Sequence, residues 1–195
     1  FKTQVVKATI RNRKNRFFNS HNGSFVFIGA ILLLFIYCTG CKTEIGPFPN
    51  EPSITYKGLT KLIGPNGKDS VIQITFDFKD GDGDIGLGVF DTMPPFNFGS
   101  DYFYNLIVNV EQQVNGNFEP ILRALTNDPV NFDTRIPVIT PQGNNKAIDG
   151  EFTLKVDVNM NAVTQPDSIK FNLFIYDRAL NKSNVIETPV VFIDL

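Results

Sequence analysis

The sequence has very few of the side chains that most often do chemistry near neutral pH. It contains one histidine, His21, and two cysteines, Cys38 and Cys41, so neither residue type occurs after residue 41. Nucleophilic triads and dyads need an imidazole base, and zinc sites usually need histidine or cysteine ligands. The part of the chain after Cys41 therefore lacks the residues for either chemistry.

Helical periodicity is also absent, and so are acidic residues in the first part of the chain. No stretch of ten or more residues after residue 53 repeats its apolar residues with a helical period. A glycine-rich loop therefore has no helix N-terminus on which to hold a phosphate. Residues 1–41 carry six basic residues and no acid, which leaves 12 basic and 20 acidic residues, a formal charge of −8, for the rest. That acidic surface argues against a nucleic acid partner.

A short apolar segment, FVFIGAILLLFIY at residues 25–37, follows the basic residues. As a helix it would be about 20 Å long against a hydrocarbon core of about 30 Å, which is too short for a comfortable membrane span. A basic stretch, a short apolar run and then small residues, here Thr39 and Gly40 before Cys41, are typical of a secretory signal peptide. An uncleaved signal anchor is the alternative.

The segment that ends at Cys41 resembles the lipobox of bacterial lipoproteins, although Cys38 stands where leucine is usual. The resemblance implies a signal peptide over residues 1–40, two acyl chains on Cys41 as the new N-terminus, and a tether over residues 41–52. Lys42 implies, in the same family pattern, sorting to the outer membrane, on its periplasmic side or at the cell surface. We therefore expect the membrane to be a partner, through the lipid on Cys41.

From residue 53 onward apolar and polar residues alternate, which is the period of strands with one buried face. Strands are expected near residues 56–63, 71–78, 103–114, 117–124, 151–158, 168–176 and 185–193. This spacing without helices predicts an all-β fold, a single antiparallel β-sandwich of immunoglobulin-like or fibronectin-III-like architecture over residues 53–195. The likeness is architectural only, because this part has no tryptophan and no cysteine pair. A small open barrel is the alternative.

Two Asn-Gly pairs, at residues 66–67 and 115–116, predict tight hairpins between these strands. Asn-Gly is favoured where both central residues of a turn need a positive φ. We expect both pairs to adopt that conformation.

An acidic, glycine-rich loop with the sequence DGDGDIG follows one of the predicted strands at residues 80–86. Glycine allows the backbone to fold so that Asp80, Asp82 and Asp84 converge. Ca²⁺ prefers about six to eight oxygen ligands, many of them from carboxylates. The sequence therefore predicts a candidate Ca²⁺ site at these three residues, in which the ion would act as a structural clip.

The loop nevertheless departs from an EF-hand. Ile85 stands where the sharp turn needs glycine, Asp91 stands at the twelfth place where glutamate is usual, and no helices flank the loop. The alternative is a solvated acidic turn, because charges about 6.5 Å apart in water repel by only about 0.6 kcal/mol. Repulsion alone therefore does not demand a cation.

The segment DRALNKSN at residues 177–184 predicts a tight turn in which Asp, Asn and Ser side chains bond to their own backbone. The alternative makes Asp177 or Asn181 a further cation ligand. Together with the acidic loop, this turn resembles small lipid-anchored sandwich proteins of Bacteroidota-type bacteria, over most of residues 70–193. That resemblance implies no activity.

Residues 90–104 are dense in aromatic residues and prolines. Such a loop could present a surface for sugar stacking or for protein binding. The alternative, favoured because 19 phenylalanines in one small sandwich must mostly be core, is that Phe96 and Phe98 cap one open end.

These features favour a non-enzymatic, lipid-anchored envelope module that binds a protein or a glycan, with Ca²⁺ as a stabilising ion. We expect no catalytic residue. One alternative is a carboxylate-dependent polysaccharide hydrolase, which would need two acids about 5–5.5 Å or about 6.5–9.5 Å apart in a cleft. Another is a structural spacer, which would have neither a pocket nor an apolar patch.

Overall fold

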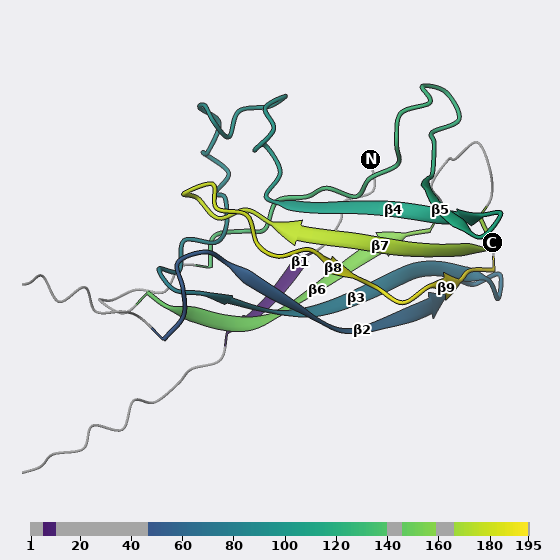
Figure 1. The fold of residues 1–195 in the computed structure, drawn as a ribbon, viewed down its shortest axis with the longest axis horizontal. Helices are drawn as coiled ribbons and strands as arrows, with labels where there is room; N and C mark the ends of the chain where they lie inside the picture. The colour runs from purple at the N-terminus through teal and green to yellow at the C-terminus, as the bar shows by residue number, and fades with distance from the viewer. Residues whose placement is uncertain (1–5, 11–46, 140–145, 159–165, 195) are drawn as a thin grey trace, which may run out of the picture.

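The computed structural model describes residues 6–10, 47–139, 146–158 and 166–194, and all regular structure in these ranges is β-strand. The strands form two antiparallel sheets that lie one over the other (Figure 1). The all-β sandwich predicted from the sequence is therefore confirmed. Most of the predicted signal peptide, including its apolar run at residues 25–37, and Cys41 lie outside the described residues. Within the described ranges, no helix is long and apolar enough to cross a membrane.

The first sheet has the strand order β1-β6-β3-β2. Its strands are β1 (Val6–Ile10), β2 (Ser53–Ile63), β3 (Asp69–Asp80) and β6 (Ile148–Asp157). The central strand β3 pairs with both β2 and β6, and its side chains alternate as the sequence predicts. The side chains of this sheet that are at most 1% exposed are Ile72, Ile74, Phe76, Phe78, Phe152, Leu154 and Val156.

The second sheet has the order β5-β4-β7-β8, and β9 pairs with β7. Its strands are β4 (Leu106–Val114), β5 (Asn117–Pro120), β7 (Ser168–Ile175), β8 (Ile186–Glu187) and β9 (Val191–Phe192). The inner faces of both sheets fill one hydrophobic core. The rings of Phe78 and Phe152 stack in this core with centroids 4.2 Å apart.

The strand expected at residues 103–114 begins only at Leu106, and two other predicted strands are cut short beside a proline. The segment expected as one strand at residues 185–193 is divided into β8 and β9, and Pro189 between them has no N–H for the ladder. Strand β5 ends at Pro120 rather than at residue 124, and Ile121 turns into the core, where it is completely buried. Proline therefore limits both strands.

Strand β1 is not predicted from the sequence, because its residues fall in the segment interpreted as a signal peptide. It pairs antiparallel with β6, with Val6 opposite Leu154 and Ile10 opposite Gly150. A Cβ atom on Gly150 would lie 2.3 Å from the Thr9 carbonyl oxygen, so this close approach needs glycine. Cleavage before Cys41 would remove β1 and make β6 an edge strand.

The two Asn-Gly pairs differ in conformation. Asn115 has a φ of 50° and Gly116 a φ of 85°, as expected for the tight turn between β4 and β5. Between β2 and β3 only Gly67 has a positive φ, and a hydrogen bond from Gly64 N to Lys68 O, 2.7 Å long, closes a longer turn. The hairpin is present there, but the expected positive φ at Asn66 is wrong.

Candidate metal centre and the loop beside it

The structure brings the three acids of the predicted site together at the end of β3. One carboxylate oxygen from each of Asp80, Asp82 and Asp84 lies within 4.8 Å of the other two. Asp80, the last residue of β3, is completely buried, whereas the other two are half-buried. The acids therefore sit at the base of the loop rather than on a solvated turn.

Two glycines of this loop have no room for a side chain, because the backbone of neighbouring segments packs directly against them. Gly81 N donates a hydrogen bond of 2.8 Å to the carbonyl oxygen of Pro49 in the predicted tether. Gly83 has a φ of +67°, and a Cβ atom there would lie 1.8 Å from the Lys146 carbonyl oxygen. Larger residues would push the loop away from both segments and separate the carboxylates.

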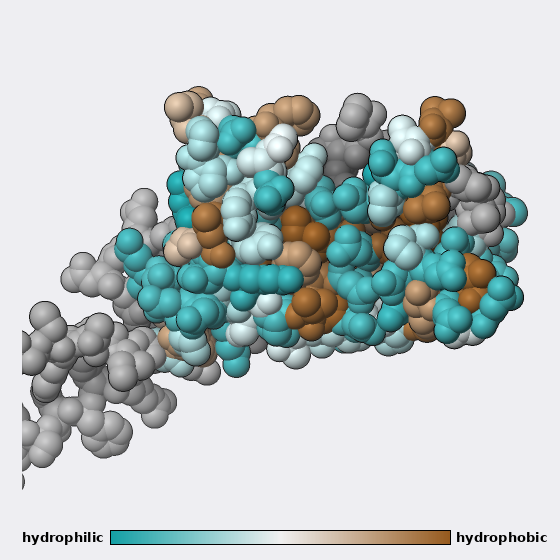
Figure 2. Space-filling model, turned by 45° about the horizontal axis from the view of Figure 1, so that its top comes forward, coloured by the Kyte–Doolittle hydropathy of each residue, from teal (hydrophilic) through white to brown (hydrophobic). Residues whose placement is uncertain are grey.

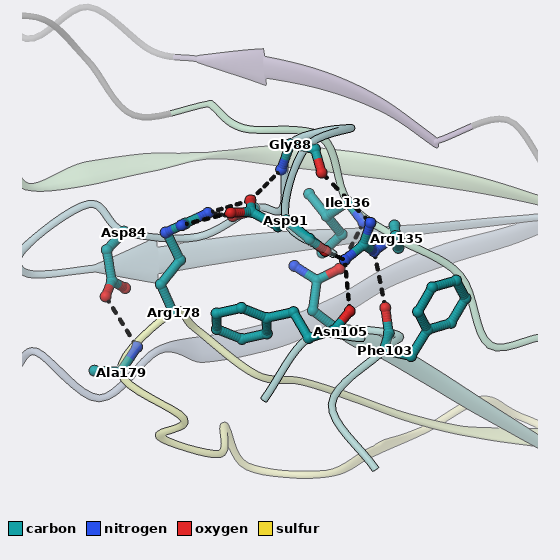
Figure 3. Close-up of polar contacts among 11 residues, drawn as sticks. Asp84, Gly88, Asp91, Phe103, Asn105, Arg135, Ile136, Arg178 and Ala179 are labelled. Carbon is teal, nitrogen blue, oxygen red and sulfur yellow. Dashed lines mark hydrogen bonds and ion pairs between the residues drawn. The ribbon is translucent and has the colours of Figure 1, made fainter. Parts of the chain in front are cut away.

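The hydrogen bonds of the cluster leave one oxygen of each carboxylate without a partner. Oδ2 of Asp80 accepts from Asp84 N at 2.9 Å. Oδ2 of Asp84 accepts from Ala179 N at 3.1 Å (Figure 3). Oδ1 of Asp80, Asp82 and Asp84 is buried and accepts no hydrogen bond from any described residue. Buried charged oxygens of this kind are unfavourable unless a proton or a cation compensates them.

Burial and mutual repulsion raise the pKa values in the cluster. Burial, and then the charges of Asp82 and Asp84, raise the pKa of Asp80 to about 7. A protonated Asp80 can donate a hydrogen bond to Asp82. Burial, and then the charge of Asp177, also raise the pKa of Asp84. Near neutral pH the cluster therefore favours uptake of a proton or of a positive ion.

The segment 177–184 forms the tight turn that the sequence favours. Oδ1 of Asp177 accepts from Asn181 N at 2.7 Å, and Oδ2 accepts from Asn181 Nδ2 at 2.8 Å. At the end of the turn, Asn184 Nδ2 donates to Ile54 O and its Oδ1 accepts from Ile54 N, each at 2.9 Å. Asp177 and Asn181 therefore stabilise the turn, and Asn184 fixes the start of β2.

Asp91 belongs to a different structure, the aromatic loop (residues 88–104). Both of its carboxylate oxygens bind the Arg178 guanidinium, at 2.6 and 2.9 Å, and Oδ2 also accepts from Gly88 N at 2.6 Å (Figure 3). The bond from Arg178, and then the Gly88 N–H, lower the pKa of Asp91 to about 2. The structure thus places Asp91, the twelfth residue counted from Asp80, in an ion pair with Arg178.

Arg135 holds the aromatic loop from inside. Its guanidinium donates to four carbonyl oxygens, those of Phe103 at 2.8 Å, Asp91 at 2.7 Å, Phe96 at 3.2 Å and Gly88 at 3.4 Å (Figure 3). It also lies over the Phe103 ring, 4.8 Å from the centroid. One side chain therefore ties the beginning, the middle and the end of the loop together.

The outer side chains of this loop are apolar and exposed. The exposed fractions are 80% for Val89, 92% for Phe90, 74% for Met93 and 85% for Phe98. In the space-filling view, tan and brown atoms stand at the top of the loop (Figure 2). The prediction that Phe98 caps the open end is therefore wrong, whereas Phe96 is half-buried with the Arg178 guanidinium 5.6 Å from its centroid.

Sequence reasoning did not identify the two arginines that shape this region. Arg135 stands 32 residues from Phe103 and 47 residues from Gly88, so no local motif marks it. Only the lack of basic residues within residues 88–104 indicates that the partner of Asp91 must come from elsewhere. No family model, no curated protein and no solved structure matches the chain, so a functional proposal depends on the arrangement of its own side chains.

Proposed function

We propose that the protein is an exported, lipid-anchored module of the cell envelope that binds a protein or a glycan without catalysing a reaction. In this proposal Asp80, Asp82 and Asp84 hold a Ca²⁺ ion. The observation that carries the metal assignment is the set of three buried carboxylate oxygens without hydrogen-bond donors. Ca²⁺ is a hard cation that accepts such ligands in irregular geometry, with carbonyls and waters completing the shell.

A structural role for the ion follows from what surrounds the cluster. Asp80 ends β3, Gly81 binds the backbone of Pro49, and Asp84 binds Ala179 N in the turn after β7. A cation here would stabilise the contact among three segments that are distant in sequence. The complete burial of Asp80 argues against direct contact with a substrate.

The same geometry favours binding over hydrolysis. A hydrolase needs two acids that face each other across an open cleft, whereas Asp80 is completely buried and the other two acids are half-buried at the end of β3. The chain after Cys41 also has no imidazole or thiol. The exposed apolar residues of the aromatic loop, in turn, favour a binding module over a plain spacer.

The lipid anchor is tested by the mass of the protein purified from its own cells. We expect a chain that begins at Cys41 and carries acyl groups on that residue. Cys41→Ser should accumulate with residues 1–40 still attached, and the matched variant Cys38→Ser should be processed normally, because Cys38 would leave with the signal peptide. An unmodified protein that keeps residues 1–40 and carries no acyl groups would refute the anchor.

A further inference from the structure

Contacts connect the aromatic loop to the point where the predicted tether enters the sandwich. Pro49 O accepts a hydrogen bond from Gly81 N in the acidic loop. In the same loop Asp84 binds Ala179 N, and Arg178, the residue before Ala179, pairs with Asp91 of the aromatic loop. Figure 1 shows the same arrangement, since the described chain resumes at residue 47 at the end of the sandwich from which the aromatic loop rises. The tether and the aromatic loop therefore share one end of the molecule.

The length of the tether sets how far that end can be from a membrane. Five residues lie between Cys41 and Pro47, and the six Cα-to-Cα steps from one to the other span at most about 20 Å when fully extended. Acyl chains on Cys41 would lie in the bilayer. The bilayer surface must then stay within about this distance of the end that carries the aromatic loop.

The chemistry of the aromatic loop fits a lipid surface better than a glycan. Its only acids are Asp91, which is paired with Arg178, and Asp101, and it has no lysine or arginine. The guanidinium of Arg135 is already occupied by four carbonyl oxygens of the loop. A sugar needs polar partners beside the rings, whereas a bilayer interface accepts exposed, uncharged Phe, Met and Val side chains.

We infer that the exposed side chains of the aromatic loop, Val89, Phe90, Met93 and Phe98, insert into the surface of the membrane to which the protein is anchored. This inference rests on the proposed lipid at Cys41, because that lipid brings a bilayer to this end without any other partner. The lipid and the loop would then form two attachments. Strand β9, which contains Phe192, lies at the opposite end of the sandwich and would face away from the membrane (Figure 1).

The chain has no tryptophan, so a single introduced tryptophan is a unique reporter. The test uses the mature acylated protein in vesicles of phosphatidylcholine brominated along its acyl chains. Phe98→Trp should lose about half of its emission relative to unbrominated vesicles, because interfacial side chains enter the boundary by about 5–10 Å. The control Phe192→Trp, at a residue that is 71% exposed, should lose none. Equal quenching at both positions, or none at either, would overturn the inference.

The mass of the same samples separates this inference from the anchor. Acylated protein with an unquenched tryptophan at position 98 overturns the membrane contact and leaves the anchor intact. If the protein carries no lipid, quenching at position 98 by added vesicles still supports the contact, and its absence overturns it. Protection of that tryptophan from acrylamide in native envelopes but not in lipid vesicles would assign the loop to a protein partner and would also overturn the contact.

Discussion

A charged Asp80 should destabilise the protein when no cation is bound. Burial and the charges of Asp82 and Asp84 raise the pKa of Asp80 from 3.8 to about 7. The folded state then binds the proton more tightly than the unfolded state, so the free energy of unfolding falls as the pH rises from about 4 to about 7. The difference between the two pKa values corresponds to a decrease of about 4 kcal/mol in the free energy of unfolding. This is an upper bound, because the loop can relax and admit water.

Ca²⁺ should reverse this loss by taking the place of the proton. A ligand at a hundredfold excess over its dissociation constant stabilises the folded state by about 2.7 kcal/mol. For a domain of this size each kcal/mol raises the melting midpoint by about 2–4 °C, so we expect a rise of about 5–10 °C near pH 7.5. Near pH 5 the rise should be much smaller, because protons compete with the ion for the carboxylates.

Thermal melts of Asp80→Asn with Ca²⁺ and with chelator make this reasoning refutable. The amide removes the buried charge and can donate to a neighbouring carboxylate, so without Ca²⁺ the variant should melt above the unmodified protein near pH 7.5. The variant should also lose the response to Ca²⁺. The control Asp101→Asn, at an exposed acid, should change neither property. A midpoint of the unmodified protein that Ca²⁺ does not raise, or a chelated Asp80→Asn that melts lower, would refute the argument.

Two other predictions concern the aromatic loop and the first strand. Arg135→Ala should lower the free energy of unfolding by about 2–3 kcal/mol and expose the loop to chymotrypsin, because it removes the donor to four carbonyl oxygens. The control Arg123→Ala removes one contact of 3.5 Å to Asn131 and should lower the free energy of unfolding by less than about 0.5 kcal/mol. Equal cleavage of both variants by chymotrypsin would show that Arg135 does not hold the aromatic loop in place. Deletion of residues 1–41 should lower the melting midpoint by less than about 5 °C, because the buried core lies between Ile54 and Ile193. A collapse of the truncated chain would make β1 part of the fold and contradict the signal peptide.

Features that depend on neighbouring residues were predictable from the sequence. The alternation along β3 and β6 identifies their buried faces, because side chains of a strand point alternately to its two faces. Asp80, Asp82 and Asp84 could be grouped because one short loop carries all three. The prediction of one continuous strand at residues 185–193 was too long, because it used apolar periodicity alone. That periodicity takes no account of Pro189, which has no N–H to donate to the ladder.

Features that depend on distant residues were not predictable. The contact of the acidic loop with the tether joins Gly81 to Pro49, and the roles of Arg135 and Arg178 depend on carbonyls and a carboxylate far away in sequence. Phe98 was assigned to the core because phenylalanine is usually buried. In this loop the backbone carbonyls bind the half-buried guanidinium of Arg135, and the ring of Phe98 is left outside.

The shape of the aromatic loop depends on contacts between Arg135 and backbone carbonyls, and the exposed side chains of the loop take no part in these contacts. The backbone is fixed by carbonyl contacts that do not depend on the identity of Val89, Phe90 or Met93, whose side chains point into solvent. These three positions should consequently tolerate replacement without loss of the loop's shape. The loop is thus suited to grafting, in which new side chains at these three positions are carried by a backbone that keeps its contacts with Arg135.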